Sequence, residues 1–172
     1  MEISDQDTCG RIVATGLAAC EDKSSLLYAD LLNIAGRRYH EQNRLAKCRE
    51  RWEDTMRIRR EHLPSDDISS KCGAPRCSYS PLITKVGAIY HNLGNMETAT
   101  GNLDEAIDYY QRATEIYVKH EAASQLALTD LCVGRLYLLQ DKYQEARNMV
   151  ARSEALFLRE LGTDRGSAAQ YV

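Results

Sequence analysis

The sequence predicts an all-α fold in which antiparallel helix pairs stack into a solenoid, with about three repeats and the start of a fourth. Three observations support this prediction. The chain resembles itself at a spacing of 40 residues, so that Gly94 matches Gly134 and Glu105-Ala106 matches Glu145-Ala146. Apolar residues recur at steps of three and four, which places them on one face of a helix. Only three prolines and ten glycines interrupt the 172 residues, so long helices can form.

The same pattern fits the upstream part of the chain at an offset of 58 residues. Gly36 then matches Gly94, and Trp52 matches Tyr110. The 18-residue surplus falls in residues 64–81, which are rich in Ser, Gly, Pro and Cys and have no helical period, so we predict an inserted loop there. Two interpretations stay open: a functional surface loop, or a retained intron that has been translated.

The repeats define a set of expected segments. Residues 1–24 match no repeat and are expected to form an N-terminal cap or remnant, with a short helix near residues 11–20. Because the chain stops within the first helix of a fourth repeat, we expect an uncovered apolar face and self-association through that end. The other segments are repeat 1 at 25–63, the loop at 64–81, repeat 2 at 82–121, repeat 3 at 122–162 and a truncated repeat 4 at 163–172. The expected helices cover about 25–41, 45–62, 82–100, 103–120, 122–140 and 143–161.

Small and large residues alternate along the facing sides of each pair. Small residues let two helices approach closely, and large ones are expected to fill the space between adjacent repeats. The small residues are Gly94, Gly134, Ala106 and Ala146, and the large ones are Trp52, Tyr110 and Val150.

This order of residues resembles the tetratricopeptide repeat. Counted along each repeat, a glycine stands eighth, a tyrosine eleventh, a small residue twentieth, an aromatic twenty-fourth and a small residue twenty-seventh. The period near 40 and the sequence from Asp104 to Ala113, DEAIDYYQRA, most resemble the kinesin-light-chain or MalT-like subtype. The resemblance covers about residues 26–172 without the loop. The sequence departs from the family pattern at four positions, where we expect weak or irregular packing: Thr55, Glu97, Asp130 and Ser153.

The resemblance implies a non-catalytic scaffold that binds a peptide or a partner helix on a concave face lined by the first helix of each pair. The N-terminus has no signal-peptide pattern, so a cytoplasmic location is expected. Asn side chains on the concave face are expected to hold a ligand backbone by paired hydrogen bonds, and Arg37 and Arg135 to take a carboxylate. The open alternative is that these are solvated polar residues without a ligand. The implied positions are Asn33, Arg37 and His40, then His91, Asn95 and Thr98, then Leu131, Arg135 and Leu138.

A second hypothesis follows from residues 1–24. They loosely resemble the segment that leads into such repeats in fungal NLR-like proteins, where a nucleotide-binding domain precedes the array. The chain would then be a detached ligand-sensing or autoinhibitory tail of a STAND-type signalling NTPase. No phosphate-binding loop of the G-x-x-x-x-G-K-[ST] type occurs in the sequence, so nucleotide hydrolysis by this chain is not expected.

Several classes of function are not expected. The sequence has no G-x-S-x-G or H-E-x-x-H motif, which argues against the hydrolases that use them, and no cofactor is expected. Cys72 and Cys77, with His62 or His91, are poorly spaced for zinc, so no metal is expected and the six cysteines are predicted to be free thiols, with Cys48 and Cys132 buried.

Charge and hydropathy point away from nucleic acid and membrane. The net charge is −3, and the basic residues of helix 45–62 alternate with acids, which predicts a salt-bridged surface more than a nucleic-acid site. No apolar stretch approaches 18 residues. The sequence therefore predicts protein or peptide partners.

Overall fold

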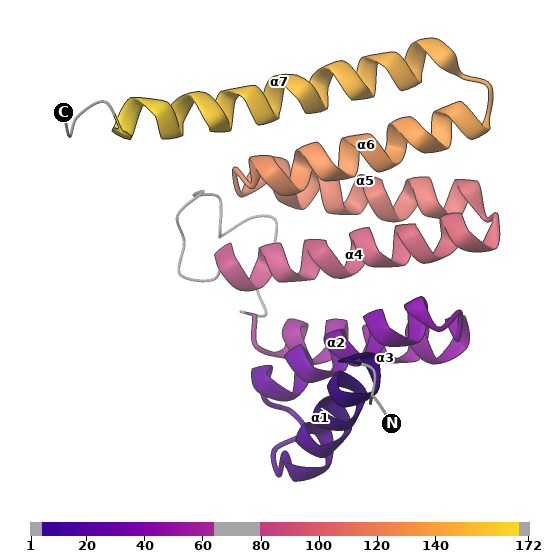
Figure 1. Cartoon of the computed structure of the whole chain (residues 1–172), viewed down its shortest axis with the longest axis vertical. Helices are drawn as coiled ribbons and strands as arrows, with labels where there is room; N and C mark the ends of the chain where they lie inside the picture. Colours follow the sequence, from indigo (N-terminus) through magenta and orange to yellow (C-terminus); the bar gives the residue numbers. More distant parts are fainter. Residues whose placement is uncertain (1–4, 64–79, 169–172) are drawn as a thin grey trace. The chain divides into compact units, whose positions relative to one another are not determined.

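The structure, a computed structural model, describes residues 5–63 and 80–168, and every regular element in these ranges is an α-helix (Figure 1). This confirms the predicted all-α class. The chain divides into two compact units, residues 1–71 and 72–172, each of which has its own packing.

The first unit consists of α1 (Asp5–Ala19), α2 (Leu26–Glu41) and α3 (Leu45–Glu61). Helix α2 packs against both α1 and α3, so the predicted short helix near residues 11–20 is part of α1. Ser25 caps α2, because its hydroxyl accepts the backbone N–H of Tyr28 at 3.2 Å. One buried apolar cluster consists of Ala29, Leu32 and Ile58, with Leu17 and Tyr28 around it.

The second unit consists of α4 (Ser80–Thr100), α5 (Leu103–Lys119), α6 (Ala123–Leu139) and α7 (Tyr143–Ala168). Helix α4 pairs with α5 and α6 pairs with α7, and α6 also contacts α5 and α4 (Figure 1). The first helix of one pair thus covers the second helix of the pair before it, as stacking requires. The residues of this junction are Ala106, Tyr110 and Leu136, with Leu103, Ile107, Cys132 and Val133 packed around them.

The helix boundaries differ from the prediction at two places. Helix α4 begins at Ser80, so the last two residues of the predicted loop 64–81 are helical, while 64–79 lie outside the described residues. Helix α7 was expected to end near residue 161 but continues to Ala168. Gly162 lies within it, because a single glycine costs a helix only about 1 kcal/mol. The predicted first helix of repeat 4 therefore continues α7 over 163–168, and residues 169–172 are not described.

A glycine of the first helix faces a large side chain of the second helix in each of the first two pairs. A Cβ atom added to Gly36 would lie 2.5 Å from Nε1 of Trp52, and one added to Gly94 would lie 2.7 Å from Cε1 of Tyr110. The rings of Trp52 and Tyr110 therefore occupy the space that each glycine leaves within its own helix pair. They were predicted to fill the space between adjacent repeats. Tyr110 does both, since it also belongs to the junction with α6.

Four of the turns between helices share one hydrogen-bonding pattern, the Schellman motif. One residue of each turn has a positive φ, and the next residue's N–H reaches back to a carbonyl five residues earlier. These N–H donors are Arg44, Asn102, Ala122 and Lys142, at 2.8–2.9 Å. Gly101 adopts the positive φ without strain, while Asn43, Glu121 and Asp141 adopt it with a side chain present.

Two of these turns also carry a cation above an aromatic ring. The Arg44 guanidinium lies 5.0 Å from the ring centre of Tyr39, and the Lys142 ammonium lies 5.8 Å from that of Tyr137. The tyrosine is the eleventh residue of its repeat, and the cation immediately precedes the second helix. Such a contact contributes about 0.5–1 kcal/mol at an exposed position.

In repeat 2 the same two positions are Glu97 and Asn102. The Asn102 amide donates to Glu97 Oε2 at 2.8 Å, and the Thr100 hydroxyl donates to the same oxygen at 3.2 Å. Glu97 is fully buried. The expectation of weak packing at Glu97 was therefore wrong, because its carboxylate and the neighbouring amide replace the ring and the cation together.

Asp130 is also fully buried, and it too has a partner. Arg152 binds it with two N–H groups, one of them Nε–H to Oδ2 at 2.6 Å, and these hydrogen bonds raise the pKa of Arg152. Forty residues earlier, Arg112 lies 5.8 Å from the ring centre of Tyr90. The arginine thus contacts an aromatic ring in repeat 2 and a carboxylate in repeat 3, and weak packing was the wrong expectation here as well.

Thr55 and Ser153 stand where the family pattern has alanine, and each bonds across its helix pair. The Ser153 hydroxyl donates to the carbonyl of Ala127 at 2.8 Å, and that of Thr55 approaches the carbonyl of Ala29 at 3.4 Å while donating to Arg51 at 2.7 Å. These hydroxyls are satisfied, so their burial brings no unpaired polar group.

We expect equivalent glycines to respond differently to substitution. Gly94→Ala should destabilise the protein by about 1–3 kcal/mol, because the Tyr110 ring must move. Gly134→Ala should be neutral or stabilise by up to about 1 kcal/mol, since a Cβ there meets nothing closer than 3.4 Å and alanine favours the helix. Urea unfolding followed by circular dichroism measures both, and equal losses would contradict this account of the packing.

The second prediction concerns the buried carboxylate. Arg152→Ala should cost about 2–3 kcal/mol, because it leaves the charge of Asp130 without its partner. Arg112→Ala is the matched control and should cost less than about 1 kcal/mol, since only a cation–ring contact is lost. Unfolding free energies from urea titrations decide the matter, and a smaller loss for Arg152→Ala than for Arg112→Ala would refute the assignment.

Candidate protein-binding surface

The first helices of the two pairs in the second unit lie against each other and form one surface. We call it the α4–α6 surface. Helices α4 and α6 are in contact, and His91 Nδ1 lies 3.0 Å from the Thr129 hydroxyl across that contact. The surface consists of Ala88, His91, Asn95 and Thr98 on α4 and of Leu128, Leu131, Arg135 and Leu138 on α6.

His91 contributes to the contact between the two helices. Its ring packs edge-on against Tyr110, with the ring centres 5.5 Å apart, and it shares a hydrogen bond with Thr129. Burial lowers its pKa below the ordinary value of 6.5. His91 is therefore a neutral side chain that joins the helices, and it is only half exposed to any ligand.

Asn95 uses its carbonyl oxygen inside the protein. Oδ1 accepts the Tyr110 hydroxyl at 2.7 Å and lies 3.7 Å from the Cys132 sulfur, which also donates to it. The predicted paired hydrogen bonds with a ligand backbone need this same oxygen. Asn95 therefore positions Tyr110 and Cys132, and the exposed side chains of the surface are those of α6.

Helix α6 has four exposed leucines: three of them form a row with one arginine, and the fourth, Leu139, follows the row at the end of the helix. The exposed fractions of Leu128, Leu131 and Leu138 are 51%, 40% and 51%, and Arg135 between them is exposed as well. Arg135 makes no ion pair with any of the described residues, and its charge acts on Tyr110 and Cys132, where it opposes the rise in pKa that burial causes. The repeat positions predicted Leu131, Arg135 and Leu138 but not Leu128, which lies one turn before Leu131.

The predicted positions of the first unit lie on α2 and are less exposed, apart from Arg37. Asn33 is half-buried, and its Oδ1 has no hydrogen-bond partner in the described part of the chain. The His40 ring lies 6.0 Å from the Trp52 ring, and its Nε2 is likewise buried and unpaired within that part. Arg37 is exposed.

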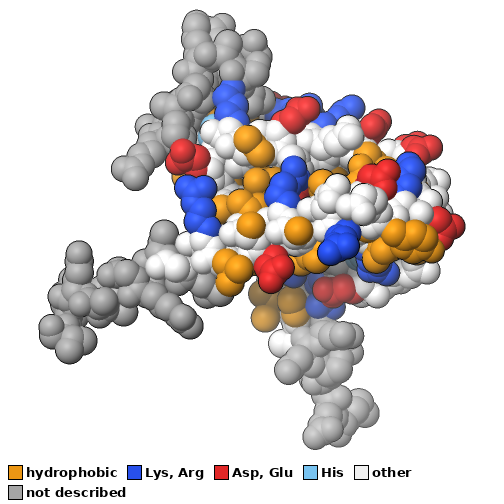
Figure 2. All heavy atoms as spheres, turned by 90° about the horizontal axis from the view of Figure 1, so that it is seen from above, with side chains coloured by type: hydrophobic (Ala, Val, Ile, Leu, Met, Phe, Trp, Pro, Cys, Tyr) orange, Lys and Arg blue, Asp and Glu red, His pale blue; other side chains and the backbone are white. Residues whose placement is uncertain are grey.

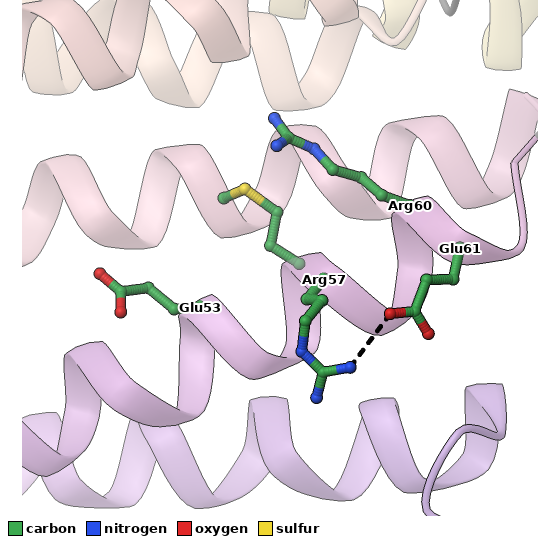
Figure 3. A pocket seen from close by; sticks show the side chains of 5 residues that line it. Glu53, Arg57, Arg60 and Glu61 are labelled. Atoms are coloured by element: carbon green, nitrogen blue, oxygen red, sulfur yellow. Dashed lines mark hydrogen bonds and ion pairs between the residues drawn. The ribbon is translucent and has the colours of Figure 1, made fainter. Parts of the chain in front are cut away.

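Helix α3 has a charged face with a pocket of about 430 Å³ (Figure 3). Arg57 donates to Glu61 at 3.1 Å and to Asp54 at 3.4 Å, and Arg60 points away from this pair. Arg59 is buried and donates to Asp30 at 2.7 Å. The predicted alternation of acids and bases is thus present as ion pairs, which is typical of a solvated surface.

The free cysteines of the described ranges differ in burial: Cys9 is exposed and Cys20 is half-buried. Cys48 is fully buried, and burial raises its pKa to about 12. Cys132 was predicted to be buried but is half-buried, because it lies at the margin of the α5–α6 junction. Cys72 and Cys77 lie outside the described residues. Within the described ranges, no group of three His, Cys, Asp or Glu residues is placed to hold a metal ion, and no helix is long and apolar enough to span a membrane.

The comparisons with known proteins concern mainly the second unit. A family model described as "Tetratricopeptide repeat" matches residues 85–158, from the first turns of α4 to most of α7. This segment is similar to tetratricopeptide repeats. The match includes repeats 2 and 3 of the sequence analysis and less than half of the chain. No curated protein matches the sequence.

The comparison with solved structures also gives matches. Among the 34 matching chains is the crystal structure of BtubC (BKLC) from P. vanneervenii, with 16% sequence identity and a TM-score of 0.46. The match covers 92% of the present chain and 76% of that one. The tetratricopeptide-like segment is therefore identified by the family model, and the MalT-like subtype and the fungal NLR-like origin stay predictions.

We expect the burial of His91 to be visible in the pH dependence of stability. Because the folded chain has the lower pKa, the unfolded chain binds more protons, and the free energy of unfolding should fall as pH drops through 6.5 toward the folded pKa. His91→Gln should reduce this dependence. Urea unfolding at several pH values and NMR titration of the ring provide the measurement.

His120→Gln serves as the comparison, since burial also lowers the pKa of His120, with a smaller contribution from Lys119. Each substitution should remove the contribution of its own histidine to the pH dependence of the free energy of unfolding. A His91 ring that titrates above 6.5, or a slope that His91→Gln leaves unchanged, would contradict the structure.

Proposed function

We propose that the chain is a non-catalytic scaffold that binds a protein or peptide on the α4–α6 surface. The proposal rests on the exposed leucine row of α6 around Arg135. Contiguous exposed apolar side chains commonly mark interaction sites, and arginine is enriched among the residues that dominate binding energy. The family match supports it, because tetratricopeptide repeats generally mediate contacts between proteins.

The remaining parts of the proposal follow from the same repeat positions. In the first unit, Asn33, Arg37 and His40 belong to it, with exposed Arg37 as the residue best able to meet a carboxylate. His91 and Asn95 hold α4 against α6 and so keep the leucine row in place. We further propose that the protein acts in the cytoplasm without a cofactor.

Self-association through the last pair is also part of the proposal. On α7, Tyr143, Val150 and Leu158 have exposed fractions of 65%, 45% and 61%, so the face that a further helix pair would cover is open in the described residues. Figure 2, seen from the α7 side, shows hydrophobic side chains there between charged ones.

Substitution of the leucine row tests the proposed function. Peptides selected from a displayed random library on the 172-residue chain provide the ligands, and their affinities are measured by fluorescence anisotropy. Leu131→Asp combined with Leu138→Asp should weaken binding by more than about tenfold, because exposed apolar anchors are replaced by charges. Both leucines are exposed, so the fold should persist, as circular dichroism will show.

Leu27→Asp combined with Val118→Asp is the matched control, since it introduces the same two charges at exposed apolar residues outside the α4–α6 surface and the α7 face. It should leave the affinities within about twofold of those of the unchanged chain. If the control weakens binding as much as Leu131→Asp with Leu138→Asp, or if the latter has no effect, the α4–α6 surface is not the binding site.

A further inference from the structure

We infer that the occupant of the α4–α6 surface is an amphipathic helix with a carboxylate in the middle of its apolar stripe. This inference deepens the proposed function and rests on it. It starts from the spacing of the exposed row on α6. Leu128, Leu131, Arg135 and Leu138 follow one another at steps of three, four and three residues. This is the spacing of the a and d positions through which one helix packs along another.

The length of the row sets the length of the partner. Ten residues separate Leu128 from Leu138, which corresponds to roughly 15 Å along a helix at 1.5 Å per residue. A partner helix of about three turns covers this distance with four side chains at the same spacing. An extended peptide advances about 3.3 Å per residue and presents alternate side chains to one face, so it matches the row less well.

Arg135 determines the charge of the partner. It occupies an a-type position between exposed leucines, and no acidic partner for it occurs among the residues that the structure describes. The facing positions on α4 are Ala88, His91, Asn95 and Thr98, none of which is acidic. Glu97, on the same helix, is fully buried and bonded to Asn102 and Thr100. When a partner helix covers Arg135, its guanidinium loses water and is stabilised by a carboxylate with matching geometry, which the partner must therefore supply.

The side chains of α4 on this surface require an amphipathic partner. Ala88 and Thr98 are small, and His91 and Asn95 are polar and already bonded inside the contact with α6. A helix lying on the row thus meets apolar side chains from α6 and small or polar ones from α4. A helix with one apolar stripe and polar flanks fits these two sides. A helix that is apolar all round would leave its outer apolar faces exposed to water.

Three designed peptides test the inference on the 172-residue chain. The first is a helix of about 18 residues with leucines at a and d positions and a single glutamate at the central a position, long enough to be helical in isolation. The second has lysine in place of that glutamate. The third has the composition of the first with two central prolines, which prevent the helix. All three are checked to be monomeric at the concentrations used, and anisotropy gives the dissociation constants.

The glutamate peptide should bind about tenfold or more tightly than the lysine peptide and the proline peptide, and Arg135→Glu should reverse the preference between the first two. Equal binding of the glutamate and proline peptides would overturn the helical partner while leaving the proposed surface intact. Equal binding of the glutamate and lysine peptides would overturn the role of Arg135. Binding of the glutamate peptide weaker than about 1 mM would overturn the inference. If a displayed peptide still depends on Leu131 and Leu138 in that case, the proposed function survives.

Discussion

The packing of Tyr110 is the interaction on which the second unit depends. Its ring occupies the space left by Gly94, its hydroxyl donates to Asn95 at 2.7 Å, and it shares a buried cluster with Leu136 of the next pair. One side chain on α5 therefore joins α4 to α6. Since a single helix pair cannot bury its apolar face alone, this junction is also what places the first helices of two pairs side by side. The exposed leucine row exists as a surface because of that placement.

The repeats tolerate sequence change when two positions change together. Tyr39 with Arg44 and Tyr137 with Lys142 are ring–cation contacts, while Glu97 with Asn102 is a hydrogen bond. The backbone of the turn is the same in all three cases, so the local fold depends on a matched pair more than on one residue type. The arginine that contacts a ring in repeat 2 and Asp130 in repeat 3 follows the same rule. A buried charge is acceptable at such a position only because its partner is present.

Periodicity was sufficient to predict the helices, because the apolar stripes and the matched glycines depend only on spacing along the chain. The end of α7 could not be predicted in this way, since Gly162 is compatible with both a turn and a helix interior. The partners of Glu97 and Asp130 were missed because each is a pairing between side chains on different elements. For the candidate surface, spacing predicted the positions on α6, but exposure and the internal hydrogen bonds of Asn95 depend on how the helices pack.

Amide hydrogen exchange on Tyr110→Ala tests most directly whether this residue joins the two pairs. Removal of the ring leaves a cavity between α4, α5 and α6, and it removes the donor to Asn95. The account predicts faster amide exchange in α4 and α6 as well as in α5. Tyr110→Phe keeps the ring and should change exchange mainly in the helical turn of α4 that contains Asn95. Faster exchange confined to α5, with the amides of α6 as protected as in the unchanged chain, would contradict it.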